Sequence, residues 1–386
     1  MRSCRGHSGA TLLVVVSAFV WWFLVGCSNS GQPNVPIPAN QASVSKSPTQ
    51  PTAEGQVSRS QAVLNQAVKP GEPGCSAAVG RRGEILWTGV AGVSNVQRRD
   101  LITAGTVFDV GSVSKQFTAT AILLLQQEGE LSVDDRLSRH LAGLPAWADG
   151  VTLAHLMHHV SGIPETEETL IDKGYRPQDR VKRATLRKAI NEIQHLDFQP
   201  GQRWVYNNAN YFLLAEVVER RSRQPFDAYL KTRIFFPLHL KMSVGYESPV
   251  DGKATSYKYN NLNQPVGADW RWDALGSGGI QTTPSQLVVW ADNYRSGKVG
   301  GTALQQAQLS GAVSTTLGGS NPSDSEVYGA GIFKLTDGML VHGGTYGGFR
   351  TSLVISSDRG TALAVACNLY DINIEAVTEN LQAVWE

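Results

Sequence analysis

The sequence predicts an α+β fold: an antiparallel β-sheet flanked by helices, with a mostly helical part inserted in the middle of the chain. Strand-like runs of apolar and β-branched residues occur near both ends, whereas residues from about 131 to 267 form helical segments and loops. Strands from the two ends are expected to pair in one sheet, with the helices packed beside it. We therefore predict a single folded domain, residues 58–386, with a helical insertion at about 131–267.

Composition sets broad limits on function. The chain has 386 residues, of which 41% are hydrophobic and 17% charged, enough for one large or two modest folded units. Its formal net charge of +1 indicates neither a basic surface for nucleic acid nor an acidic run for a basic partner. We expect no nucleic-acid partner.

The N-terminal residues predict an export signal. Arg2 and Arg5 precede an uncharged apolar run from Ala10 to Leu24, followed by Val25-Gly26-Cys27. This ending resembles the bacterial lipoprotein signal, which implies that residues 1–27 form the signal and that Cys27 is lipidated. The alternative is an uncleaved membrane anchor, because the run is nearly long enough to span a bilayer. Both interpretations place the folded part at the bacterial cell envelope, facing the periplasm or the exterior.

The segments that follow predict the elements in order. Residues 28–57 are rich in Pro, Ser, Gln and Asn, which is typical of a flexible linker. Next we expect a helix over Ser58–Val68, then a hairpin of Cys75–Gly80 and Glu84–Gly92. Helices are expected in the middle of the chain over Leu131–Leu141, Thr152–His159, Ala184–His195, Asn210–Arg221 and Phe226–Ile234. After a helix near Ser285–Tyr294, the end of the chain predicts strands over Gly329–Lys334, Leu340–Gly344, Phe349–Ser356 and Thr361–Leu369, and a last helix over Ile372–Trp385.

Two cysteines lie in the folded part. Cys75 and Cys367 each belong to a predicted strand, and an oxidising compartment would permit a disulfide if those strands were neighbours. Neither the pairing nor the geometry follows from the sequence, so we predict two buried thiols.

The first candidate site residues are Ser112 and Lys115. They stand three residues apart at the start of a strongly apolar helical segment, so they lie on one face one turn apart. The free backbone N–H groups of a helix start would stabilise an oxyanion over Ser112. The same pattern at Ser43 to Lys46 lies in polar sequence with no helix to support it. The alternative role for Ser112 is an ordinary helix N-cap.

Two further segments offer groups that complete a site. Tyr206 and Asn208 precede the apolar helix predicted from Asn210, which would fix them at its entry, although Tyr206 could equally be a half-buried tyrosine with its hydroxyl satisfied. The segment from His342 to Arg350 contains four glycines between two predicted strands, so its backbone can approach a ligand closely. His342 adds a ring that titrates near neutral pH.

Taken together, these segments resemble the serine β-lactamase and penicillin-binding protein superfamily, in the branch of class C β-lactamases, D,D-carboxypeptidases and related esterases. The resemblance covers about Gln56 to Glu386 and rests on FDVGSVSKQFTATAILLL, HLMHHVSGI, PGQRWVYNNANYFLL, GSGGIQTTPSQL and HGGTYGGF. It implies a β-lactamase/transpeptidase-like fold, with Ser112 as the acylated nucleophile, Lys115 as its partner amine and Tyr206 as general base and acid. It also implies that Asn208 contacts the substrate amide, that His342, Gly343, Gly344 and Thr345 line the substrate, and that the N–H groups of Ser112 and Thr345 form the oxyanion hole.

Two expectations concern charge. The ammonium of Lys115 should favour the phenolate of Tyr206 and so lower the Tyr206 pKa. His342 stands where many members have lysine, so a clamp on a substrate carboxylate is weakened unless Thr345 or Arg350 supplies it. We therefore expect esters or amides to be accepted without a strict need for a carboxylate.

The resemblance leaves the activity open among esterase, D,D-peptidase and β-lactamase, because a fold does not fix a substrate. A non-catalytic ligand sensor or scaffold that keeps the pocket is the alternative function. No cofactor and no metal are expected, since His155, His158 and His159 lie in a segment that matches a structural part of the same family.

Overall fold

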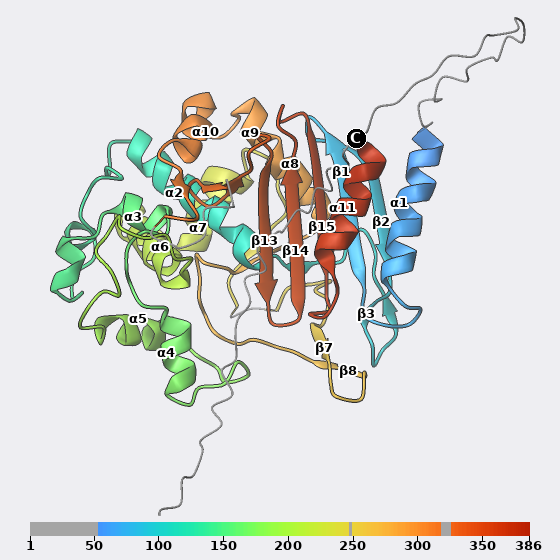
Figure 1. Ribbon diagram of the computed structural model, residues 1–386, viewed down its shortest axis with the longest axis horizontal. Coiled ribbons are helices and arrows are strands. Elements are labelled where there is room, and N and C mark those ends of the chain that lie inside the picture. The colour runs from blue at the N-terminus through green and yellow to red at the C-terminus, as the bar shows by residue number, and fades with distance from the viewer. Residues whose placement is uncertain (1–52, 247–248, 318–325) are drawn as a thin grey trace, which may run out of the picture. The chain divides into compact units, whose positions relative to one another are not determined.

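The computed structural model describes residues 53–246, 249–317 and 326–386. Its largest sheet has eight antiparallel strands in the order β10-β11-β12-β13-β14-β15-β1-β2 (Figure 1), which confirms the predicted sheet built from both ends of the chain. These strands are β1 (Cys75–Arg81), β2 (Glu84–Ala91), β10 (Val313–Ser314), β11 (Val327–Tyr328), β12 (Phe333–Lys334), β13 (Leu340–Tyr346), β14 (Phe349–Ile355) and β15 (Thr361–Cys367). The predicted hairpin is β1–β2, and the first strand pairs with the last.

The pairing of β1 with β15 corrects the prediction of two buried thiols. Cys75 lies directly opposite Cys367 in the register of the two strands, with their Cα atoms 4.0 Å apart, and the two residues form a disulfide. Strand neighbours 292 residues apart in sequence cannot be identified from either run alone. The disulfide therefore ties the two ends of the domain together.

Helices cover both faces of this sheet. Helix α1 (Ala53–Ala67) packs against α11 (Ile374–Trp385) and β2, and α11 packs against β14 and β15, while α8 (Pro284–Ala291) contacts β1, β2 and β15. Because α1 begins at Ala53, residues 53–57 are helical and not part of the linker as predicted. Gln56 shows the reason, since its side-chain amide donates to the backbone oxygen of Val384 at 3.1 Å and so docks this turn. The predicted signal, Cys27 and the rest of the linker lie outside the described residues.

The part of the chain between β5 (Phe108–Asp109) and β9 (Ile280–Thr282) is mainly helical, and its helices lie to one side of the sheet, beyond β13 (Figure 1). Its helices are α2 (Lys115–Gln127), α3 (Leu153–Met157), α4 (Thr166–Asp172), α5 (Arg183–Asn191), α6 (Asn208–Ser222) and α7 (Phe226–Leu230), the last running into a π-helical turn over Lys231–Phe235. Short strands that the sequence did not indicate also occur, namely β6 (Ser243–Val244), β7 (Tyr257–Tyr259) and β8 (Pro265–Gly267). The remaining elements are β3 (Val93–Asn95), β4 (Asp100–Leu101), α9 (Asn293–Ser296) and α10 (Gly301–Leu309).

One predicted helix, Leu131–Leu141, is wrong. Only Leu137–Arg139 forms a single 3₁₀ turn there. The backbone groups of this loop are bonded elsewhere: Leu137 N donates to Val151 O at 2.8 Å, and the Asp135 carboxylate accepts from Ser132 N at 2.8 Å. These bonds replace the helical ladder that the apolar spacing suggested.

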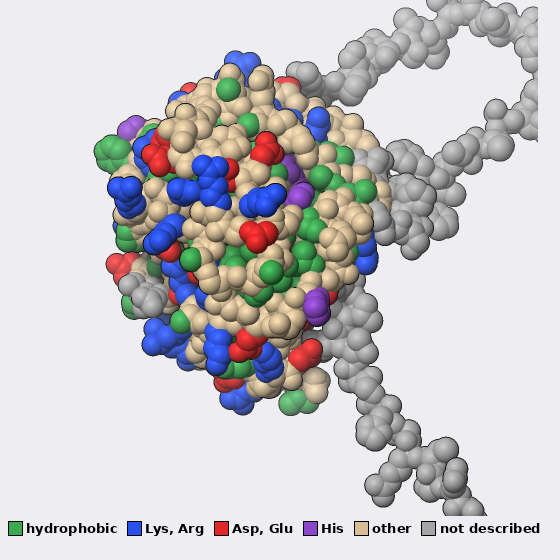
Figure 2. All heavy atoms as spheres, turned by 90° about the vertical axis from the view of Figure 1, so that its left-hand side faces the viewer, with side chains coloured by type: hydrophobic (Ala, Val, Ile, Leu, Met, Phe, Trp, Pro, Cys, Tyr) green, Lys and Arg blue, Asp and Glu red, His purple; other side chains and the backbone are tan. Residues whose placement is uncertain are grey.

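The surface beside the helical part is mixed in charge. Ion pairs such as Arg183–Glu219 and Lys173–Glu192, each at 2.8 Å, hold neighbouring segments. On the side of the molecule shown in Figure 2, Lys and Arg side chains are interspersed with Asp and Glu. In the part of the chain that the structure describes, none of the helices is long and apolar enough to span a membrane.

Candidate active site

Ser112 lies on a short 3₁₀ turn, Gly111–Ser114, that joins β5 to α2. The turn begins at Gly111 with φ 49°, a left-handed conformation that favours glycine, and its N–H is held by Asp109 Oδ1 at 2.9 Å. Ser112 is partly exposed while its neighbours on the turn are buried. The turn therefore presents one hydroxyl to solvent from a fixed backbone.

Lys115 is fully buried behind Ser112. Its Nζ donates to Ser112 Oγ at 3.1 Å, Asn208 Oδ1 at 2.8 Å and Ser277 O at 3.0 Å, so all three ammonium hydrogens have acceptors. Burial lowers the pKa of Lys115 to about 7, although the nearby carboxylates Glu167 and Glu165 act to raise it. The structure thus has the expected contact between Ser112 and Lys115, and it adds a contact between Lys115 and Asn208 that was not predicted.

Tyr206 completes this group. The Lys115 Nζ lies 4.7 Å from the centre of the Tyr206 ring. The Tyr206 hydroxyl is buried, and no described protein group forms an aligned hydrogen bond with it. The Ser112 hydroxyl is near enough to favour the phenolate, which by itself would lower the Tyr206 pKa. Burial outweighs this effect and raises the pKa of Tyr206 above its ordinary value. Our expectation of a lowered Tyr206 pKa was wrong, because it counted the charge of Lys115 and left out the cost of desolvating a phenolate.

His159 holds the segment that carries Tyr206. Its backbone oxygen accepts from Val205 N at 2.9 Å and its Nδ1 accepts from Asn207 N at 3.2 Å, one residue on either side of Tyr206. The centres of the His159 and Tyr206 rings lie 4.3 Å apart. Burial, together with the nearby charge of Lys115, keeps the pKa of His159 well below its ordinary value, so the ring is neutral. In the described residues no group of three or more His, Cys, Asp or Glu side chains is placed to hold a metal ion.

Strand β13 forms the wall beside Ser112. Gly344 lies against the loop of the nucleophile so closely that an added Cβ would overlap the Val110 carbonyl oxygen and lie 3.2 Å from Ser112 N. In the same way, a Cβ on Gly111 would lie 2.7 Å from Thr345 N. The N–H groups of Ser112 and Thr345 thus belong to two backbones in close contact. No side chain larger than hydrogen fits at either glycine.

His342 does not offer a titratable ring to solvent. It is 3% exposed, with Nε2 at 3.2 Å from Tyr328 Oη and Nδ1 at 2.6 Å from Gly343 O. Burial lowers the pKa of His342 to about 3, so the ring is neutral at pH 7, which corrects our expectation of a charge that changes there. Arg350 is also engaged, because its Nη2 donates to Glu375 Oε1 at 2.8 Å. Neither side chain is a free cation for a substrate carboxylate.

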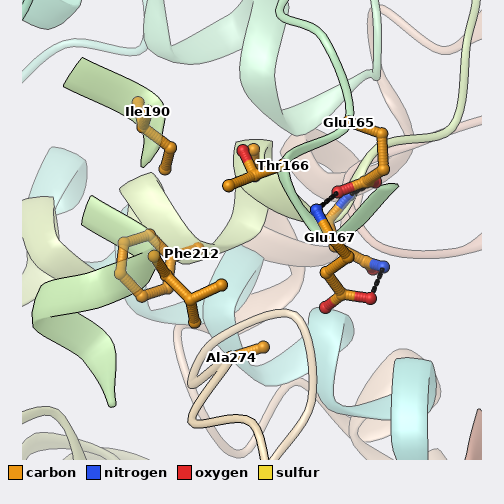
Figure 3. Close-up of a pocket in the computed structure, with 9 residues that line it drawn as sticks. Glu165, Thr166, Glu167, Ile190, Phe212 and Ala274 are labelled. Atoms are coloured by element: carbon orange, nitrogen blue, oxygen red, sulfur yellow. Dashed lines mark hydrogen bonds between the residues drawn. The ribbon is translucent and has the colours of Figure 1, made fainter. Parts of the chain in front are cut away.

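Two carboxylates that were not predicted from the sequence lie beside Asn208. Glu165 Oε2 accepts from Asn208 N at 2.7 Å, and Glu167 Oε2 accepts from Asn208 Nδ2 at 3.3 Å (Figure 3). Burial first, and then their mutual repulsion, raises the pKa of Glu167 to about 8, while burial raises that of Glu165 as well. The acidic run from Glu165 to Glu168, which begins two residues after Ile163, is the feature of the sequence that could have indicated these carboxylates.

The chain is similar in sequence to two bacterial proteins. The chain is 31% identical over 183 residues to Penicillin-binding protein 4* of Bacillus subtilis (strain 168), a match that covers 46% of this chain and 40% of that protein. It is 26% identical over 330 residues to Protein flp of Staphylococcus aureus (strain COL), which covers 80% of this chain and 62% of that protein. The chain therefore spans less than two thirds of the length of either relative.

A solved structure of D-amino acid amidase from Ochrobactrum anthropi SV3 has the same fold, with a TM-score of 0.70 and 22% identity, over 86% of this chain and 99% of that one. The superfamily of β-lactamases and penicillin-binding proteins consists of serine hydrolases, and its fold is the one described above. The family model named Beta-lactamase matches residues 60–382, and this chain accordingly belongs to the Beta-lactamase family.

Proposed function

We propose that this chain cleaves an ester or amide through an acyl-enzyme on Ser112, as a hydrolase of the class C β-lactamase or D,D-carboxypeptidase type. The observation that carries the proposal is the contact of Lys115 Nζ with Ser112 Oγ at 3.1 Å, beside the Tyr206 ring. An ordinary N-cap serine needs no buried amine at this distance. The partial exposure of Ser112 adds the access that a substrate requires.

The pKa values support the following order of proton transfers. With its pKa near 7, about half of Lys115 is neutral at pH 7, and the neutral amine takes the Ser112 proton as Oγ attacks the substrate carbonyl. The N–H groups of Ser112 and Thr345 stabilise the oxyanion. Tyr206, whose pKa is raised, keeps its proton until it donates it to the leaving group, and Lys115 returns the Ser112 proton to Tyr206. Water then takes the place of the leaving group and attacks the acyl-enzyme. The same proton transfers run in reverse, so that the bond to Ser112 Oγ breaks and the acid is released.

The surroundings favour substrates without a required carboxylate. His342 is neutral and bonded to Tyr328, and Arg350 is paired with Glu375, so neither supplies a cation at the wall of the site. We expect neutral acyl esters to be hydrolysed at least as well as D-Ala-D-Ala peptides and cephalosporins. A strong preference for the carboxylate-bearing substrates would contradict this part of the proposal.

Covalent labelling tests the nucleophile. A fluorophosphonate or a fluorescent penicillin should modify the wild-type chain and leave Ser112→Ala unlabelled, with both proteins showing the same thermal unfolding. Folded protein that takes up neither probe would favour the alternative function, a ligand sensor or scaffold.

For the N-terminal part we propose export to the bacterial cell envelope and anchoring to the membrane by a lipid on Cys27. The support is the sequence Leu24-Val25-Gly26-Cys27 after an apolar run. Radioactive palmitate fed to an expressing bacterium should label the wild type and spare Cys27→Ala. Equal labelling of the two proteins would reject the anchor at this residue.

A further inference from the structure

Asp109 is a buried acid at the start of the turn that carries Ser112. It ends β5, it is 0% exposed, and its Oδ1 accepts from Gly111 N at 2.9 Å. Its second oxygen, Oδ2, is also buried, and among the described residues no hydrogen bond reaches it. The Gly111 N–H is thus the one hydrogen-bond donor that the described part of the chain provides for this carboxylate.

The cost of burying this carboxylate needs an explanation. Burial raises the pKa of Asp109 to about 6, although the charge of Lys253 and the Gly111 N–H act to lower it. At pH 7 the side chain is therefore charged in about nine tenths of the molecules. Asparagine has nearly the same shape, and its side-chain oxygen would accept from Gly111 N at a smaller cost of burial. The stability of the fold alone does not explain an acid in this place.

The residue opposite Asp109 does not stabilise its charge. Gln281 of β9 is the register partner of Asp109, so the two side chains lie on one face of the strand pair. Gln281 Nε2 donates to Gly245 O at 2.5 Å, and Gln281 Oε1 is buried without a partner. Each of the two side chains therefore has an acceptor oxygen without a donor. The Asp109 carboxylate is held in place by its bond to Gly111.

This bond fixes the backbone directly before Ser112. Gly111 has φ 49°, a conformation that glycine adopts about as readily as others, so an additional interaction has to select it. Asp109 supplies that interaction, because its oxygen closes a turn over Val110 with a charge-assisted hydrogen bond, a kind about twice as strong as a neutral one. On its other side Gly111 lies against Thr345, where an added Cβ would be 2.7 Å from Thr345 N. A rotation of the backbone at Gly111 would displace Ser112 relative to Thr345.

We propose that Asp109 is a positioning residue for the hydrolysis: its carboxylate holds Gly111 in the left-handed conformation that directs Ser112 Oγ to the substrate and Ser112 N to the oxyanion. This inference rests on the proposed function, because it places the reacting carbonyl at Ser112. Asp109 acts through Gly111 and does not contact the substrate. A misplacement of about 1 Å can cost about a hundredfold in rate, so loss of the bond should lower kcat and leave KM nearly unchanged.

Two variants of nearly the same shape separate the hydrogen bond from packing. Asp109→Asn keeps an oxygen for Gly111 N and removes the charge, whereas Asp109→Leu fills the same space without an acceptor. With p-nitrophenyl butyrate at pH 7, we expect Asp109→Leu to lower kcat about a hundredfold with KM within about threefold, and Asp109→Asn to lower kcat less than about tenfold. Asp109→Asn should nevertheless unfold at a higher urea concentration than the wild type, because it buries no charge. A merely structural role would make activity and stability change together.

Asp337→Leu is the matched control. Asp337 is exposed, and its Oδ1 accepts from Met339 N at 2.8 Å, a bond of the same kind in the turn before β13. This variant should have the kcat of the wild type. Wild-type kcat in Asp109→Leu, or equal losses of kcat in Asp109→Asn and Asp109→Leu, overturns the proposal. Thermal unfolding shows whether the variants fold, and Asp109→Ala replaces Asp109→Leu if the leucine variant does not.

Hydrogen exchange separates this proposal from the proposed function. By NMR, the Gly111 N–H should exchange at least about tenfold more slowly in the wild type and Asp109→Asn than in Asp109→Leu. A wild type that neither hydrolyses the ester nor takes up a fluorophosphonate would refute the proposed function, and the difference in exchange would still assign the shape of this turn to Asp109. Equal exchange in the three proteins would overturn the role of Asp109, whatever the activity.

Discussion

Gly344→Ala tests whether the close approach of β13 to the nucleophile loop sets the geometry of the site. The new Cβ would overlap the Val110 carbonyl oxygen and press on Ser112 N from 3.2 Å. In a close-packed interior this overlap requires the two backbones to separate by about 1 Å, and overpacking of this kind costs about 1–3 kcal/mol of stability. Because the shift moves Ser112 away from Thr345, we expect kcat to fall by about a hundredfold.

The neighbouring residue supplies the control. A Cβ at Gly343 would meet nothing closer than 3.7 Å, an ordinary van der Waals contact. Gly343→Ala should therefore unfold within about 0.5 kcal/mol of the wild type. The assays are urea unfolding and hydrolysis of p-nitrophenyl butyrate. If the two alanine variants unfold at the same urea concentration, the described approach of β13 to Val110 is wrong, whatever the activity of the protein.

Three further predictions concern the buried groups. Lys115→Met should be more stable than the wild type at pH 6 and should lose about 3 kcal/mol of that gain by pH 9, because the cost of burying the charged amine is full below its folded pKa of about 7 and disappears as the pH rises toward 10.5. Urea unfolding at both pH values measures this difference, with exposed Lys298→Met as the control. A difference in stability that does not change with pH would contradict the prediction. Tyr206→Phe should lower kcat by about 10²–10⁴-fold without loss of thermal stability, since the buried hydroxyl of Tyr206 has no aligned hydrogen-bond partner. A lower melting temperature for the variant would contradict this, because it would mean that the hydroxyl forms a hydrogen bond in the folded protein. Reduction of Cys75–Cys367 should cost about 2–5 kcal/mol in unfolding experiments with and without dithiothreitol, and identical curves would mean that the thiols are free.

Apart from the sheet built from both ends of the chain, the features that the sequence pattern predicted correctly are local in the chain. Ser112 and Lys115 stand three residues apart on one helical turn, so their contact follows from helix geometry once α2 is recognised. The β1–β2 hairpin is likewise set by a turn between two apolar runs. The meeting of Ser112 with Tyr206 and β13 came instead from the family resemblance, because no spacing rule connects segments so far apart.

The features that the sequence did not predict depend on tertiary neighbours. The pKa of Tyr206 is set mainly by burial, which a motif does not report. Glu165 and Glu167 meet Asn208 across about 40 residues, and an acidic run of this kind is usually a solvated helix start. His342 was expected to face a ligand, but the alternation of β13 turns its ring to the buried side, against Tyr328.

The position of β1 between β15 and β2 imposes an order on biosynthesis. Its Cys75 is made 292 residues before Cys367 of its partner β15. Until β15 is made, β1 exposes an unpaired edge, and until β13 is made, Ser112 lacks the wall that Gly344 and Thr345 provide. The nucleophile thus acquires its surroundings only after β13 has been made, and a chain that stops before β13 carries an incomplete site.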